Sequence, residues 1–373
     1  MNAATPSSTS AAPGAACIRC WPTPSPPGTL TLIPPAASAA GAARPARTRA
    51  RGTAEKIWAT ESTALLLAER CGLLGGEAEF VRVLLMAFTG LRWGETVGLQ
   101  ASFIRGPDRR RNHFYIRLEW QMIELNGKFY LAPPKEGSRR DVDIPGWLFA
   151  LLQGIKAHGR RCRCPRRDDG TSACGSREAF LFLGAEAGHA RRSNYAARVF
   201  RPAADGVYPA EKRRRGYHTE RWRVHCSRDP FPGIPVPMRG MHRAKAEQLA
   251  ECSWAALIPG LTPHGLRHGH QTAMRRDRVP RVLRRDRLGH GASGDIADHY
   301  THIGDEMIED MLACLTRRWQ AAVARRARID ERHGGEPRSA LPALDEWLAL
   351  FRERPGEIQL PSALPPAPKR GAE

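Results

Sequence analysis

The spacing of apolar side chains predicts helices at both ends of the folded part of the chain, with a β-rich stretch between them. Apolar residues that recur every three to four positions form one face of a helix. Helices are predicted on this basis at about 57–72, 78–88, 93–99, 147–157, 192–202, 263–276, 280–288, 295–299, 305–327 and 341–354.

A different pattern covers residues 113–144. Apolar and polar residues alternate over 113–124, as they do in a strand with one buried face. Asn126-Gly127 is a strong signal for a tight hairpin turn. Two further strands are predicted at 129–132 and 139–144. The pattern as a whole predicts an α+β fold that is mainly helical and contains a small antiparallel three-stranded sheet.

The same pattern divides the chain into three parts. Residues 1–53 are rich in Ala, Pro, Ser and Thr without a hydrophobic period, which predicts a disordered tail. A folded domain is predicted over 54–328, with irregular insertions at about 158–192 and 205–260. Residues 329–373 are predicted to be a linker and an amphipathic helix. Its apolar stripe (Leu344, Trp347, Leu348 and Phe351) has two possible locations, its own domain or a neighbouring protomer.

Charge narrows the class of partner. The chain has 58 Lys and Arg against 38 Asp and Glu, a net charge of +20, and such a balance favours a polyanion, above all nucleic acid. No apolar run is long enough to cross a membrane, and the N-terminus lacks the features of a secretory signal. Nine cysteines in a chain of this length do not form a dense disulfide framework, so the cytoplasm is the expected compartment.

Four short segments carry the residue types that phosphodiester chemistry requires. Two guanidinium groups can hold the non-bridging oxygens, imidazoles can hydrogen-bond the phosphate or move protons, and a tyrosine hydroxyl can attack phosphorus. His264 and Arg267 share one helix face because they are three residues apart. The segments are Thr89–Glu95, Pro134–Arg139, His264–His268, and Leu288–His290 followed ten residues later by Tyr300.

In this order the four segments resemble the signature of the tyrosine recombinases, or phage integrases, over residues 54–325. The resemblance implies a tyrosine recombinase-like catalytic fold for the folded domain. The catalytic set that it implies is Arg92, Lys135, His264, Arg267, His290 and Tyr300. Lys128, one turn earlier, is a rival for the lysine. Glu95 matches the acid that follows the first arginine of the family pattern.

The resemblance also implies a mechanism and partners. Arg92, Arg267 and His264 would clamp the phosphate, and His290 would help to position it. Tyr300 would attack to give a 3′-phosphotyrosine link, and Lys135 would protonate the leaving 5′ oxygen. The partner would be double-stranded DNA, with self-association on it, and neither a small-molecule substrate nor a membrane is expected. No cofactor or metal is expected in the catalytic site. Arg92, His264, Arg267 and His290 are therefore expected to converge on one basic cleft.

Three alternatives remain open at this stage. The family carries a helical DNA-clamping domain ahead of the catalytic one, whereas residues 1–53 here are of low complexity, so the chain could be a truncated or degenerate integrase that binds DNA without efficient catalysis. A type IB topoisomerase uses similar chemistry. A zinc-stabilised interaction protein is the third, because His158, Cys162, Cys164 and Cys174 lie close together in sequence, although Cys-x-Cys is not the usual zinc spacing.

Overall fold

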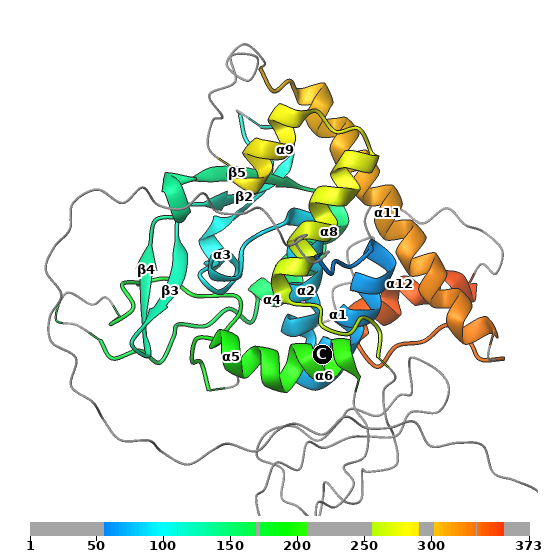
Figure 1. Ribbon diagram of the computed structural model, residues 1–373, viewed down its shortest axis with the longest axis horizontal. Helices are drawn as coiled ribbons and strands as arrows, with labels where there is room; N and C mark the ends of the chain where they lie inside the picture. Colours follow the sequence, from blue (N-terminus) through cyan, green and yellow to red (C-terminus); the bar gives the residue numbers. More distant parts are fainter. Residues whose placement is uncertain are drawn as a thin grey trace, which may run out of the picture. The chain divides into compact units, whose positions relative to one another are not determined.

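The computed structural model describes residues 56–109, 111–166, 168, 172–184, 186–206, 256–290, 302–332 and 334–353. Within these residues the predicted class is confirmed: the fold is mainly helical with a small antiparallel sheet (Figure 1). The predicted tail 1–53, the short helix 295–299 and nearly all of the insertion 205–260 lie outside the described residues. No helix among the described residues is long and apolar enough to span a membrane.

The longer helices fall close to where the apolar period predicts them, with ends that shift by a few residues. Residues 192–205 form one continuous helical segment with a π-helical turn in its middle. The helices are α1 (Glu61–Gly75), α2 (Glu77–Thr89), α3 (Trp93–Val97), α4 (Gly146–Lys156), α5 (Arg192–Tyr195), α6 (Arg201–Asp205), α8 (Pro263–Arg276), α9 (Arg281–Leu288), α11 (Asp305–Arg332) and α12 (Pro342–Glu353).

The arrangement of strands differs from the prediction. The alternating run 113–124 is two strands, because the chain leaves its first partner after Leu118 and pairs with a new one from Gln121. The result is a three-stranded sheet in the order β1-β2-β5 and a separate hairpin β3-β4, all antiparallel. The strands are β1 (Ile104–Arg105), β2 (Phe114–Leu118), β3 (Gln121–Leu125), β4 (Lys128–Ala132) and β5 (Arg140–Ile144).

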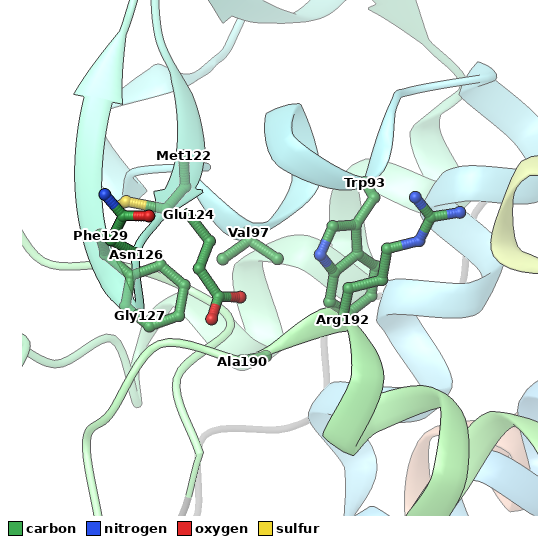
Figure 2. A pocket seen from close by; sticks show the side chains of 9 residues that line it. All are labelled: Trp93, Val97, Met122, Glu124, Asn126, Gly127, Phe129, Ala190 and Arg192. Atoms are coloured by element: carbon green, nitrogen blue, oxygen red, sulfur yellow. The ribbon is translucent and has the colours of Figure 1, made fainter. Parts of the chain in front are cut away.

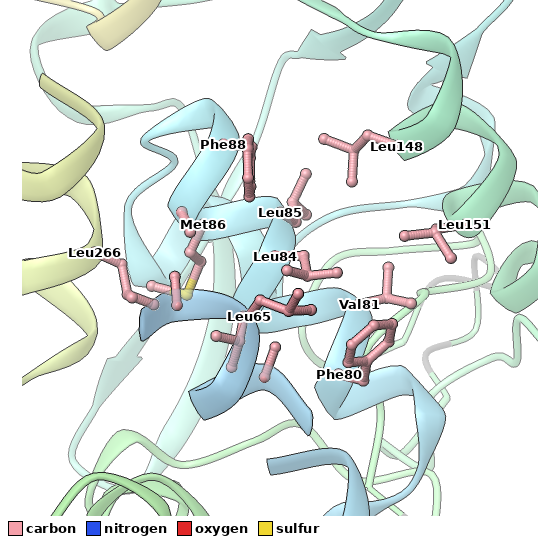
Figure 3. Packing of buried hydrophobic residues seen from close by; sticks show 14 of the residues in the cluster. Leu65, Phe80, Val81, Leu84, Leu85, Met86, Phe88, Leu148, Leu151 and Leu266 are labelled. Atoms are coloured by element: carbon pink, nitrogen blue, oxygen red, sulfur yellow. The ribbon is translucent and has the colours of Figure 1, made fainter. Parts of the chain in front are cut away.

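Helix α2 lies at the centre of the hydrophobic core. Every residue from Phe80 to Phe88 is buried, so this helix is covered on all sides. Figure 3 shows its apolar side chains between Leu65 of α1, Leu148 and Leu151 of α4, and Leu266 of α8. Because α2 ends at Thr89, this rigid packing fixes the starting point of the first sequence motif.

Helix α12 buries its apolar face within its own chain. The Trp347 ring lies 5.5 Å from that of Trp319 on α11, and Trp319 stacks on Trp147 of α4 at 4.2 Å. Leu344, Trp347, Leu348 and Phe351 are all buried. In this single chain the stripe is therefore buried against its own domain, and exchange with a neighbouring protomer stays a prediction.

Candidate catalytic site

The first motif begins where α2 ends. Gly90 has a φ of 70°, and a Cβ on this residue would lie 2.7 Å from the Leu288 side chain and 2.9 Å from that of His270. Arg92 then precedes α3, and Glu95 accepts hydrogen bonds from its backbone N–H (2.8 Å) and its Nη1 (2.9 Å). Glu95 thereby caps the start of α3 and holds the Arg92 guanidinium there.

Glu95 also pairs with an arginine that the sequence analysis did not single out. Arg140 on β5 donates from Nη1 to Glu95 Oε1 (3.1 Å) and from Nη2 to Glu95 Oε2 (2.9 Å). Burial raises the pKa of Glu95, but the hydrogen bonds and charges of Arg140 and Arg92 outweigh burial and hold the pKa below its usual value. The available sequence signal was an arginine on the same strand face as Val142 and Ile144, which are core residues.

Neutralising Glu95 is expected to destabilise the fold. In Glu95→Gln one oxygen that accepts from an arginine becomes an N–H₂ donor, and two guanidinium groups lose their counter-charge in a buried place. Breaking a buried ion pair from one side costs about 3 kcal/mol or more, so the free energy of unfolding in urea should fall by about that amount. Glu309→Gln, on an exposed position of α11, is the matched control. Equal stability of the two variants would contradict this account of Glu95.

Arg267 joins the Thr89–Glu95 segment to the Leu288–His290 segment. From α8 its Nη1 donates to the carbonyl of Gly90 (2.6 Å), and its Nη2 donates to the carbonyl of Leu288 (2.5 Å). Nη2 also lies 3.0 Å from Nε2 of His290. Arginine can only donate, so Nε2 is the acceptor and the imidazole is neutral in this pair. Burial and the nearby charge of Arg92 lower the pKa of Arg267 to about 10.

The Leu288–His290 segment also places a backbone carbonyl beside Arg92. Arg92 Nη2 donates to the carbonyl of Gly289 at 3.1 Å. Gly289 ends α9 with a φ of 61°, and a Cβ there would lie 2.6 Å from Nη1 of Arg140. This position favours glycine, both for its left-handed backbone and for the close approach of the Arg140 side chain.

Arg287 is a second buried arginine that the sequence analysis missed. It donates from Nε to His270 Nε2 (3.0 Å), from Nη1 to the Asp143 carbonyl (2.6 Å) and from Nη2 to the Phe88 carbonyl (2.9 Å). It thereby ties α9 to α2, α8 and β5. We found no sequence signal for it, because it lies in an arginine-rich segment where most positions are exposed or half-buried.

The lysine turn lies beside Arg92. Residues 135–137 form a single 3₁₀ turn between β4 and β5, and Lys135 itself is exposed. The Ser138 hydroxyl donates to the carbonyl of Lys135 (2.9 Å) and accepts from Arg92 Nη1 (3.4 Å). The rival, Lys128, is exposed at the start of β4. Ser138 thus connects the turn with Lys135 to Arg92. Among the described residues it makes no such connection for the turn with Lys128.

Two residues of the implied catalytic set, His264 and Tyr300, are not seen in contact with the two arginines in the part of the chain that the structure describes. His264 lies on the first turn of α8, exposed, with its ring 4.6 Å from that of His268. Burial, then the charges of His268 and Arg267, lower its pKa. Within the described residues no hydrogen bond joins its ring to Arg92 or Arg267. Tyr300 lies outside the described residues.

The described residues therefore bring together Arg92, Arg267 and His290, with Arg140 and Glu95 beneath them. Arg92 and Arg140 share the carboxylate of Glu95, whereas the hydrogen-bond acceptors of Arg267 among the described residues are neutral carbonyls and an imidazole. Excess positive charge in a partly buried site is costly, and a bound anion would offset that cost. A pocket of about 490 Å³ beside His290 is also basic, because Arg275, Arg281, Arg284 and Arg285 line it.

Comparisons with known proteins find similar chains only among solved structures. No protein-family model matches the sequence, and no curated protein matches it. Solved structures to which the chain is similar include those of a transposon integrase and a recombinase. The Tn1549 transposon integrase bound to transposon right-end DNA is 17% identical, with 70% of this chain and 67% of that chain covered and a TM-score of 0.42. The XerA recombinase is 14% identical, with 71% and 66% covered and a TM-score of 0.32. Likenesses at these identities and TM-scores assign neither a family nor a residue role to this chain.

Proposed function

We propose that this protein is a site-specific tyrosine recombinase that cuts and rejoins DNA through a covalent phosphotyrosine intermediate. The observation that carries the proposal is the meeting of Arg92, Arg267 and His290, which come from three separate segments, around one site with unneutralised positive charge. A phosphodiester is the anion that the basic chain and this donor geometry fit best.

In the proposed first step, Tyr300 gives its phenolic proton to an imidazole of the site or to water, and its Oη attacks the scissile phosphorus. A bond forms between the tyrosine oxygen and phosphorus, and the bond from phosphorus to the 5′ oxygen breaks. Arg92 and Arg267 stabilise the negative charge that develops on the non-bridging oxygens. Lys135 gives a proton to the leaving 5′ oxygen, and His290 and His264 hydrogen-bond the phosphate.

Rejoining is the reverse of cleavage on a partner duplex. The phosphotyrosine link conserves the energy of the phosphodiester, so a 5′ hydroxyl of another strand can attack it and release Tyr300. Exchange between two sites requires several active sites on one DNA assembly, and we propose that the protein self-associates there. We further propose that this exchange serves the integration or excision of a mobile DNA element.

The proposal is tested by covalent capture from random-sequence DNA, which requires no defined target site. The full chain is incubated with a randomised library of nicked duplexes. Cleavage near the nick releases a short fragment that carries the free 5′ hydroxyl, and its loss traps the cleaved state. Protein is then recovered under denaturing conditions, and the attached DNA is sequenced. We expect DNA attached through its 3′ end to Tyr300, with an enriched sequence. Recovery of no attached DNA under these conditions would contradict the proposal.

Salt dependence distinguishes the alternative in which the chain binds DNA without cutting it. Phosphate contacts release counterions, so the logarithm of the binding constant should fall linearly with the logarithm of salt concentration, with a slope of about −0.9 per phosphate contacted. Steep salt dependence without covalent capture would favour the degenerate DNA-binding protein. Binding that barely changes with salt would exclude a DNA role for the basic charge.

A further inference from the structure

A second cluster of chemically active side chains lies in the segment between α4 and α5, away from the arginine site. It contains Cys162, Cys164, Cys174 and His189, whose candidate ligand atoms all lie within 4.8 Å of one another. The Sγ atoms of Cys162 and Cys174 are 3.5 Å apart, and the three cysteines are free thiols. Four soft donors therefore surround one point.

The candidate ligands are mostly buried, and the histidine ring is held in one orientation. Cys162, Cys174 and His189 are buried, and His189 is only 8% exposed. Among the residues that the structure describes, neither ring nitrogen of His189 has a hydrogen-bond partner. A buried polar group without a partner is unfavourable, and a bound ligand would remove that cost. Phe129 and Phe180 fix the orientation of the ring, with centroids 5.2 and 4.8 Å from it.

The backbone of this irregular segment is organised around the four side chains. Arg160 and Phe180 exchange backbone hydrogen bonds of 3.3 and 2.9 Å, which close the segment into a loop. Within it the N–H of Ala173 donates to the carbonyl of Pro165 (2.7 Å), so that Cys174 returns to the segment with Cys162 and Cys164. An isolated bridge between Leu183 and His189 brings the histidine back to the same place.

We propose that Cys162, Cys164, Cys174 and His189 bind a structural Zn²⁺ ion. Three thiolates and one imidazole form a complete tetrahedral set that leaves no open position, which is the chemistry of a structural rather than a catalytic zinc site. The fourth ligand is His189 and not His158, the histidine suggested by proximity in sequence. His158 is exposed in the turn after α4, and its Nδ1 lies 3.2 Å from the carbonyl of Gly154 on that helix.

The metal would join the segment 160–190 to the hairpin β3-β4. The N–H of Leu131 on β4 donates to the carbonyl of Cys174 (2.8 Å), and the Phe129 ring packs against His189. Two residues after His189, the Arg191 side chain donates to the Gly127 carbonyl at 2.6 Å and pairs with Glu124. Figure 2 shows the pocket of about 430 Å³ between this hairpin, α3 and the chain at Ala190–Arg192.

This attachment has a consequence for the reaction, which rests on the proposed function. The strand β4 leads directly into the turn with Lys135, so an anchored hairpin limits where that lysine can move. Zinc binding itself does not depend on the proposed function, and its test requires no DNA.

Metal content of the full chain tests the site. Protein purified under reducing conditions from zinc-supplemented medium is expected to contain one zinc per chain by elemental analysis. Replacement by Co²⁺ should give the thiolate charge-transfer band and the strong visible bands of a tetrahedral sulfur-rich site. Cys164→Ser changes the half-buried ligand and should lose both signals, as should His189→Ala. Cys314→Ser, a half-buried free thiol on α11, should keep them.

The outcomes separate the alternatives. Chelation should lower the thermal unfolding midpoint of the wild-type protein and leave that of Cys164→Ser unchanged, because only the folded state holds the metal. Zinc that remains in both ligand variants would be bound elsewhere in the chain and would overturn the proposal. A metal-free wild-type protein, or a Cys162–Cys174 disulfide found by mass spectrometry under these conditions, would overturn it as well. Normal zinc content without covalent DNA capture would leave the zinc site intact and contradict only the proposed function.

Discussion

Tyr300→Phe is expected to abolish the covalent protein–DNA adduct while leaving the fold and the affinity for DNA unchanged. The substitution removes only the phenolic oxygen, which in the proposed mechanism is the atom that attacks phosphorus. Phosphate binding by the arginines does not require that oxygen. The measurement is the covalent capture assay, accompanied by circular dichroism and by a gel shift on the captured sequence.

Tyr130→Phe is the matched control, since Tyr130 is an exposed tyrosine on β4. It loses the same atom from the surface and should yield as much adduct as the wild-type protein. Adduct formation by Tyr300→Phe would remove Tyr300 as the nucleophile. Mass spectrometry of the adduct peptide would then identify the residue that replaces it.

Arg267→Lys is expected to slow DNA cleavage by about 10²–10³-fold, the usual effect of removing one donor that stabilises transition-state charge. Lysine keeps the positive charge, but its single ammonium cannot span the carbonyls of Gly90 and Leu288 as the planar guanidinium does. The contact between Arg267 Nη2 and His290 Nε2 would also be lost with the guanidinium. The rate of adduct formation under single-turnover conditions measures the effect, because it isolates the chemical step from product release.

The control for charge and fold is Arg317→Lys, an exposed arginine on α11, which should react at the wild-type rate. Arg267 also holds two backbone segments together, so the unfolding midpoint must be measured in parallel. A rate loss that disappears at a temperature where the variant is fully folded would assign Arg267 to stability alone. A wild-type rate in Arg267→Lys would contradict its proposed role.

Several features of this protein could be predicted from the sequence because they depend on local pattern. Helical periodicity located α2, α8 and the long helix α11 to within a few residues, since the apolar faces of these helices recur at 3.6-residue spacing. The motif segments also identified Arg92, Arg267 and His290, which come together in the structure. Gly90 and Gly289 are part of the same signal, because a left-handed turn and a close backbone approach each require glycine.

Only the tertiary structure decided which distant residues meet. Alternation over 113–124 could not reveal the change of partner after Leu118, because pairing depends on where β4 and β5 lie in space. Arg140 was missed since its partner Glu95 lies 45 residues away. Proximity in sequence suggested His158 beside the cysteines, whereas the fold brings His189 there. The apolar stripe of α12 was evident from its spacing, but burial against Trp319 follows from packing. Periodicity is a property of neighbouring residues, whereas ion pairs, ligand sets and packing partners depend on the path of the whole chain.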